Sequence, residues 1–171
     1  MLKVNTELLA NLGNFVSRSL KFLKGKFCGE VPEAVLTEVE HKLIAEVNGL
    51  LEKYVAALEA VEIREGLRLA LEISRLGNLY LSDHKLDNTL FDNDRVRCGT
   101  LITISVNLVY FLASLFYPYM PASSASILQQ LNAPVILLSL SPFLSLFFFR
   151  LSLFLLSPFI VAPSYRYQVL P

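Results

Sequence analysis

The side chains best suited to chemistry in this sequence form a polar stripe near its start. Their intervals of three, four and three residues would place them on one face of a helix. The stripe contains no acid, and two further lysines, Lys24 and Lys26, follow it. Amides and guanidinium groups can hydrogen-bond nucleobases, and lysines bind phosphate. An RNA-binding face and an ordinary solvated helix face both fit this spacing. The stripe consists of Asn11, Asn14, Arg18 and Lys21.

No residue pattern typical of an active site accompanies this stripe. The seven glycines are scattered, and none has the spacing of a phosphate-binding loop. His41 and His84 lie 43 residues apart and have no cysteine at metal-ligand spacing. Three glutamates at intervals of three residues indicate a solvated helix face, since paired catalytic acids need opposed positions around a cleft. We therefore expect neither catalytic residues nor a metal site. The three glutamates are Glu59, Glu62 and Glu65.

The composition of the chain is uneven along its length. Its 171 residues include 15 acids and 15 bases, and the net charge of zero argues against a nucleic-acid coat protein. Hydrophobic residues make up 54% of the chain, and no acid follows Asp94. The charges between residues 1 and 23 do not fit a signal peptide, and two cysteines cannot form a disulfide-rich scaffold. We expect an intracellular, reduced protein.

The polar stripe belongs to the first of several predicted helices. Apolar residues recur every three or four positions from Leu8 to Leu23. A second helix should begin at Thr37, because Glu40 stands where a capping box needs it. The residues expected to bound the first helix are Asn5 or Thr6 at its start and Gly25 with Gly29 at its end.

The remaining pattern up to residue 132 is helical as well. A third helix is expected from Ile63 to Leu81, followed by a loop over 82–94 that is rich in Asp and Asn. A fourth helix, capped by Asp92 or Asp94, should run to Tyr117, where prolines break it. Ser123 or Ser124 should cap a short fifth helix through Leu131. The sequence predicts an all-α bundle of about five helices.

Several blocks of this region resemble one protein family. The order and spacing of the blocks are similar to those in the anticodon-binding domain of eukaryotic cytosolic-type methionyl-tRNA synthetase, a class I aminoacyl-tRNA synthetase. The resemblance covers residues 2–132, and the Gly-Asn-Phe and Gly-Asn-x-Tyr blocks are its most specific parts. The blocks span 7–18, 31–33, 63–68, 73–80 and 117–121, followed by the helix to residues 130–131.

The resemblance implies recognition of tRNA. In the family, an Asn and an Arg four residues later contact bases of the CAU anticodon, and they correspond to Asn14 and Arg18. A family tryptophan that stacks on the anticodon falls at Asp87, and this chain has no tryptophan. Loss of a stacking platform costs about 1–3 kcal/mol per base. Arg75 is a further possible contact. The weaker base-contact candidate on the stripe is Asn11, and the phosphate candidates are Lys21, Lys24 and Lys26.

The resemblance also implies that this sequence lacks the catalytic domain of a full synthetase. Full synthetases carry a catalytic domain with HIGH-like and KMSKS-like ATP motifs before this helical domain, and neither motif occurs here. We expect the chain alone to be inactive as a methionine–tRNA ligase and to bind no ATP or other cofactor. Its expected partners are a tRNA with a CAU anticodon and a synthetase catalytic domain, in the cytoplasm.

A second region, residues 133–171, has a different composition. Between residues 137 and 159 every residue except Arg150 is Leu, Ser, Phe or Pro. The segment is long enough for a membrane anchor, although Pro142, Pro158 and the central arginine oppose one. It also fits a hydrophobic hairpin packed on the bundle. The favoured interpretation is a translated polypyrimidine tract, since these residue types have pyrimidine-rich codons.

Two alternative functions follow from this tail. The chain could be a tail-anchored membrane protein whose helical head binds another protein. It could also be a non-functional, truncated product whose hydrophobic tail promotes aggregation. Neither requires the polar stripe on the first helix to contact RNA.

Overall fold

The computed structural model describes residues 2–132, with side chains described from residue 10 onward. The hydrophobic tail, its boundary at residue 133 and the three interpretations of it lie outside the described residues. Within 2–132 the chain forms six α-helices and no strand, which confirms the all-α prediction. The helices are α1 (Leu2–Phe27), α2 (Glu38–Glu59), α3 (Ile63–Asp83), α4 (Asn88–Asn93), α5 (Arg95–Phe116) and α6 (Pro121–Gln130).

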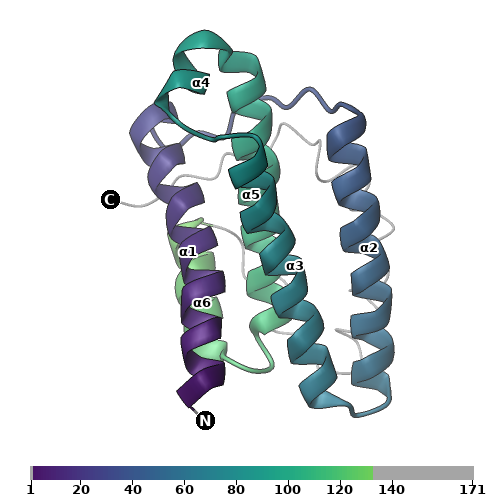
Figure 1. The fold of residues 1–171 in the computed structure, drawn as a ribbon. Coiled ribbons are helices and arrows are strands. Elements are labelled where there is room, and N and C mark those ends of the chain that lie inside the picture. Colours follow the sequence, from purple (N-terminus) through teal and green to yellow (C-terminus); the bar gives the residue numbers. More distant parts are fainter. Residues whose placement is uncertain (1, 133–171) are drawn as a thin grey trace.

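The long helices lie side by side and give the bundle two distinct ends (Figure 1). One end holds the C-terminal end of α1, the short α4 and the start of α5. The other holds the start of α1, the α2–α3 turn and the α5–α6 connection (Figure 1). Chain segments that are far apart in sequence therefore meet at the α4 end, which includes the C-terminal part of the polar stripe.

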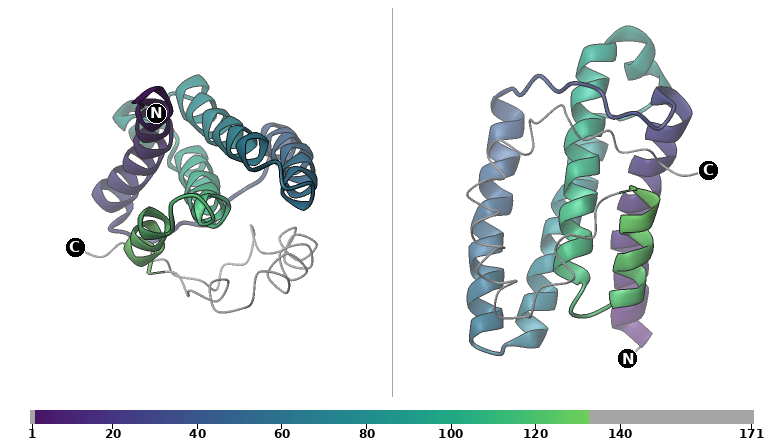
Figure 2. Two further views of the ribbon diagram at one scale, coloured as in Figure 1. Left: turned by 90° about the horizontal axis from the view of Figure 1, so that it is seen from below. Right: turned by 180° about the vertical axis from the view of Figure 1, so that it is seen from behind.

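The core is organised around α5. This helix contacts α1, α3, α4 and α6 and is buried along most of its length. Figure 2 shows it near the centre of the bundle when viewed along the helices. Among the described residues, α5 is long and apolar enough to cross a membrane, but 83% of its most apolar window is buried inside the protein. Such burial is typical of a core helix.

Several predicted helix boundaries are confirmed. Thr37 is the N-cap of α2, and the Glu40 carboxylate reaches back to accept a hydrogen bond from the Thr37 backbone N–H at 2.9 Å. Asp94 caps α5 and accepts from the Arg97 backbone N–H at 2.9 Å. These caps are predictable because both partners lie within one turn of sequence.

Other boundaries were predicted wrongly. Helix α1 begins at Leu2, before both predicted cap residues, and Gly25 lies inside it. Met120, not a serine, is the N-cap of α6, because Pro121 occupies the first turn, where its missing N–H costs nothing. The predicted loop over 82–94 contains α4, whose N-cap Asp87 accepts from the Leu90 backbone N–H at 2.8 Å.

Candidate nucleic-acid interface

The central pair of the polar stripe lies at the surface of α1. Asn14 is exposed, and Arg18 is partly exposed beside the end of α3. The Arg18 Nη1 donates a hydrogen bond to Ser82 Oγ at 3.3 Å. Arg18 follows Asn14 by four positions, so the two residues lie about 6 Å apart along the helix axis. An amide and a guanidinium are thus presented together on one flank of the bundle.

Asn11 lies on the side of α1 that packs against α3, so it does not share the open face predicted for it. Its amide nitrogen donates to the Leu71 carbonyl at 3.3 Å. Its Oδ1 accepts from Ser74 Oγ at 3.2 Å and from Asn78 Nδ2 at 2.9 Å. A base contact by Asn11 would require breaking these bonds. Its RNA role stays a prediction, and its role in the structure is to join α1 to α3.

The predicted phosphate-binding lysines extend the surface toward the α4 end. Lys21 and Lys24 are exposed, and neither forms an ion pair with another residue in the 10–132 range. The Nζ of Lys26 instead lies 5.2 Å from the centre of the Phe91 ring. Arg95 approaches the same ring, with its Cζ 5.1 Å from the centre. Cationic groups from α1 and α5 therefore converge on α4.

The two remaining candidate residues have local partners. Arg75 is exposed and forms an ion pair with Glu72 on the same helix, with Nη2 and Oε1 2.6 Å apart. A phosphate would compete with that carboxylate for the guanidinium. Asp87 is exposed and uses its carboxylate to cap α4. At this position the chain has a capping residue in place of an aromatic platform.

Sequence reasoning missed three residues of this surface. Ser82 accepts from Arg18 and Phe91 lies beside Lys26, but both stand in the stretch predicted as a polar loop. Arg95, just after that stretch, approaches Phe91. The signal that could have found Phe91 is Asp87, which stands three residues before Leu90 as an N-cap should. A helix that starts at this Asp carries Phe91 in its middle.

A buried ionic network holds the helices beneath this surface. Glu40, with 0% of its side chain exposed, accepts from Tyr80 Oη at 2.6 Å, and Arg97 Nη1 lies 2.8 Å from its Oε1. Thr37 Oγ1 also donates to it, at 2.5 Å. Burial raises the pKa of Glu40, but hydrogen bonds from Thr37, Tyr80 and Arg97 outweigh burial and lower it from 4.5 to about 2. One carboxylate thus ties together α2, α3 and α5.

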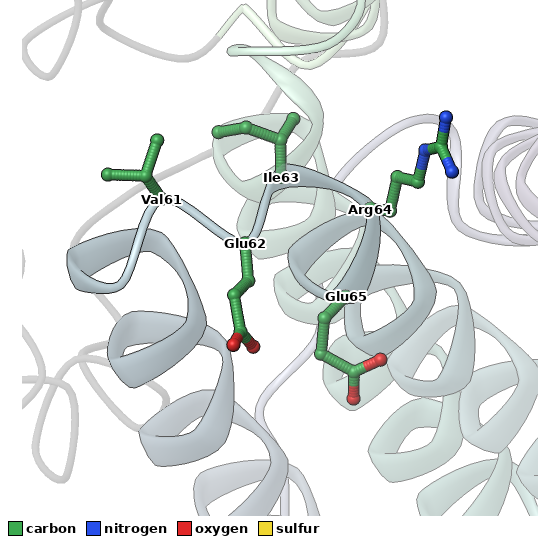
Figure 3. Close-up of a pocket in the computed structure, with 5 residues that line it drawn as sticks. All are labelled: Val61, Glu62, Ile63, Arg64 and Glu65. Atoms are coloured by element: carbon green, nitrogen blue, oxygen red, sulfur yellow. The ribbon is translucent and has the colours of Figure 1, made fainter.

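A shallow depression at the other end of the bundle offers no convergent chemistry. It is lined by residues 61–65 at the α2–α3 turn. Figure 3 shows the carboxylates of Glu62 and Glu65 pointing away from Val61, Ile63 and the Arg64 guanidinium. The turn separates α2 from α3, so the glutamates spaced by three do not lie on a single helix. Across the described part of the chain, no group of three His, Cys, Asp or Glu side chains could hold a metal ion.

Comparison with known proteins identifies methionine–tRNA ligases as relatives. A family model described as the anticodon binding domain of methionyl tRNA ligase matches residues 31–136. The probable cytoplasmic methionine–tRNA ligase of Schizosaccharomyces pombe is 51% identical over 136 residues, which cover 76% of this chain and 17% of that protein. The human cytoplasmic methionine–tRNA ligase is 43% identical over 136 residues, covering 78% of this chain and 15% of that protein.

Solved structures share the same fold. The apo form of Mycobacterium tuberculosis methionyl-tRNA synthetase superposes with a TM-score of 0.71 at 24% identity, covering 99% of this chain and 32% of that one. Its complex with methionyl-adenylate gives 0.72 at the same identity. This chain therefore spans about a third of the length of those synthetases and less than a fifth of the curated relatives.

Proposed function

Because the chain belongs to the family of methionyl-tRNA ligase anticodon-binding domains, we propose that it binds the CAU anticodon loop of a tRNA through the exposed flank of α1. The observation that carries the proposal is the paired presentation of Asn14 and Arg18 at the surface. An amide offers a donor and an acceptor to a base edge, and a guanidinium can bond or stack on a base. Lys21 and Lys24 lie along the same helix to bind the backbone.

The reaction that this binding serves would belong to a larger assembly. We propose that a methionine–tRNA ligase catalytic domain, in the cytoplasm where the relatives are named, is the partner of this chain. That domain would bind ATP and methionine, while this chain would contribute tRNA binding and no catalytic residue or cofactor. The residues that the structure describes fit the tRNA-binding part of this division, since the exposed groups of α1 include an amide and ammonium groups that suit RNA.

A base-reading arginine can be separated from a general positive charge by mutation. We expect Arg18→Ala in the full chain to weaken binding of a CAU anticodon stem-loop by roughly 5- to 150-fold, as for loss of a base contact of 1–3 kcal/mol. The preference for CAU over a loop with another anticodon should fall in parallel. Binding is measured by filter titration at fixed salt. Arg18→Lys keeps the charge but loses the planar group, so it should recover little of the preference.

Lys42→Ala is the control, because Lys42 is an exposed cation on α2, away from the polar stripe. It should leave the affinity for the stem-loop nearly unchanged. Equal effects of Arg18→Ala and Lys42→Ala would show that binding is non-specific and would contradict the proposal.

The lysines should act through the salt dependence of binding. Each of Lys21→Gln and Lys24→Gln should weaken all RNA loops alike and reduce the slope of log K against log salt by about 0.7–1. Titrations at four or five salt concentrations measure this slope. A loss of CAU preference with an unchanged slope would instead make these lysines base contacts.

A further inference from the structure

Phe91 holds an unusual position for a phenylalanine in this bundle. It is partly exposed on α4, a helix in which no residue is buried. Its neighbours Leu86 and Leu90 pack against the hydrophobic core, whereas Phe91 does not. Its aromatic contact is an edge-on one with Phe27, with the ring centres 5.3 Å apart and the planes at 86°. Burial in the core therefore does not explain why this ring is placed here.

Two cations border the ring, one from α1 and one from α5. Lys26 Nζ and Arg95 Cζ lie 5.2 and 5.1 Å from the ring centre, so two like charges share one aromatic ring. Attraction to an exposed ring contributes only about 0.5–1 kcal/mol per cation, and the two cations repel each other. Asp87 and Asp94 each accept a backbone N–H as helix caps, and within residues 10–132 neither Lys26 nor Arg95 forms an ion pair with Asp87, Asp92 or Asp94. A phosphate bound by either cation beside the ring would offset this repulsion.

We propose that Phe91 is a stacking platform for an unpaired nucleobase, with Lys26 and Arg95 binding the adjoining phosphates. An aromatic ring beside cationic side chains is how proteins hold single-stranded nucleic acid. This inference rests on the proposed function, because it assigns a second contact point for the same RNA loop.

The two contact points are within reach of one RNA loop. Lys26 follows Arg18 by eight residues, which is about 12 Å along α1. Arg18 is bonded to Ser82, and the chain runs from Ser82 through one short loop into α4. Figure 1 shows α4 above the end of α1. A loop that contacts Arg18 with one base can therefore place another base over Phe91.

The test substitutes the ring while keeping an apolar side chain. Phe91→Leu in the full chain should weaken binding of the CAU anticodon stem-loop by roughly 5- to 150-fold, as for loss of one stacked base, with the salt slope unchanged. Phe91→Tyr, which keeps the ring, should bind like the wild type. Tyr117→Leu is the control, because it removes another partly exposed ring at the far end of the bundle. Circular dichroism and urea unfolding check that each variant is folded.

A fluorescent base locates the stacked position. Stem-loops carrying 2-aminopurine at one loop position at a time are titrated with wild type and Phe91→Leu. We expect one position whose fluorescence is quenched by the wild type and not by Phe91→Leu. Lys26→Gln and Arg95→Gln should each lower the salt slope by about 0.7–1.

The outcomes separate this inference from the proposed function. If Arg18→Ala weakens binding while Phe91→Leu and the quenching do not change, the platform is refuted and the proposed function stands. If the wild-type chain binds no CAU stem-loop, both fail. If Phe91→Leu weakens binding and Phe91→Tyr restores it, the platform is supported even where Phe91→Leu is also less stable.

Discussion

At the scale of single residues, the most specific sequence blocks turn out to build the scaffold. Gly77 lies where α3 meets Phe15 of α1 and Leu108 of α5. Asn78 donates to the Asn11 carbonyl at 2.9 Å, and Tyr80 donates to buried Glu40. Of the two blocks, only Asn14 has an exposed polar side chain free for RNA. The family signature and the proposed RNA contacts are therefore largely different sets of residues.

Gly77 should tolerate no larger side chain. A Cβ there would lie 2.7 Å from Phe15 Cζ and 2.9 Å from a methyl carbon of Leu108. Because three helices meet at this point, we expect Gly77→Ala to lower the free energy of unfolding by about 1–3 kcal/mol. Gly13→Ala is the matched control on α1, where a Cβ meets nothing within 4 Å. It should raise stability by about 0.5–1 kcal/mol. Urea unfolding measures both, and a stabilised Gly77→Ala would show that α1 and α3 can move apart at little cost.

Asp87 links the capping of α4 to RNA affinity. We expect Asp87→Trp to tighten binding of the CAU stem-loop, because it adds an aromatic ring and removes a charge that repels phosphate. It should also lower the free energy of unfolding by about 0.5–2 kcal/mol, since the bond to the Leu90 N–H is lost. Asp87→Asn removes the charge and keeps the cap. If Asp87→Asn and Asp87→Trp tighten binding of the CAU stem-loop equally, loss of charge repulsion alone accounts for the gain in affinity.

At the scale of helices, the α2–α3 turn carries a conformational penalty. Val61 has a φ of 60° in the left-handed region, which glycine normally occupies at the end of a helix. The Glu62 N–H bonds to the Ala57 carbonyl at 2.8 Å and the Val61 N–H to the Leu58 carbonyl at 3.0 Å. This is the Schellman pattern with a β-branched residue in the glycine position.

Replacement of this valine should therefore stabilise the protein. Val61 is 76% exposed, so little burial is lost in Val61→Gly. Relief of about 1–2 kcal/mol of left-handed strain should exceed the added entropy of the unfolded chain of about 0.4–1 kcal/mol. We expect a higher urea midpoint. Val96→Gly, at a 65% exposed valine inside α5, should have the opposite sign. Destabilisation by both changes would mean that the turn has no strain to release.

The helices show what sequence can and cannot predict. The Thr37–Glu40 and Asp94 caps were predictable, since each depends on residues within one turn. Helix α4 was missed because its stability comes from one cap and contacts with α5, while its composition resembles a loop. Helical periodicity predicted the surface positions of Asn14 and Lys21 on α1. It could not show that Asn11 faces another helix, because polar residues bound to a neighbour and polar residues in water have the same spacing.

At the scale of the whole molecule, the two ends of the bundle have different properties. The α4 end gathers the cations of α1 and α5, while the α2–α3 end presents exposed Val61 and Ile63. The helices hold these ends apart, so RNA binding and contacts at the α2–α3 turn can occur together. The carboxylate of Glu40 lies beneath the α4 end and fixes the relative positions of α2, α3 and α5.

Glu40 should make the stability of the whole bundle depend on acid pH. Its pKa is about 2 in the folded protein, below the ordinary value of 4.5 for a glutamate, so it stabilises the fold fully above pH 4.5. That stabilisation, about 3 kcal/mol at 1.36 kcal/mol per pKa unit, should be lost as pH falls from 4.5 toward 2. Glu40→Gln should be less stable at pH 7, because Arg97 loses its charged partner, and the difference from wild type should shrink over this pH range.

Urea unfolding of the full chain at pH values from 7 to 2 measures that difference. Hydrogen bonds from Arg68 and Arg75 also lower the pKa values of Glu65 and Glu72, but these exposed pairs are present in both proteins and cancel. Glu38→Gln, an exposed acid in the same first turn of α2, should keep the wild-type pH dependence. If Glu40→Gln differs from wild type by the same amount at pH 2.5 as at pH 7, the carboxylate charge does not hold the three helices together. The contribution of Glu40 to the free energy of unfolding would then come from its shape and neutral hydrogen bonds. The α4 end of the bundle would keep its geometry in acid.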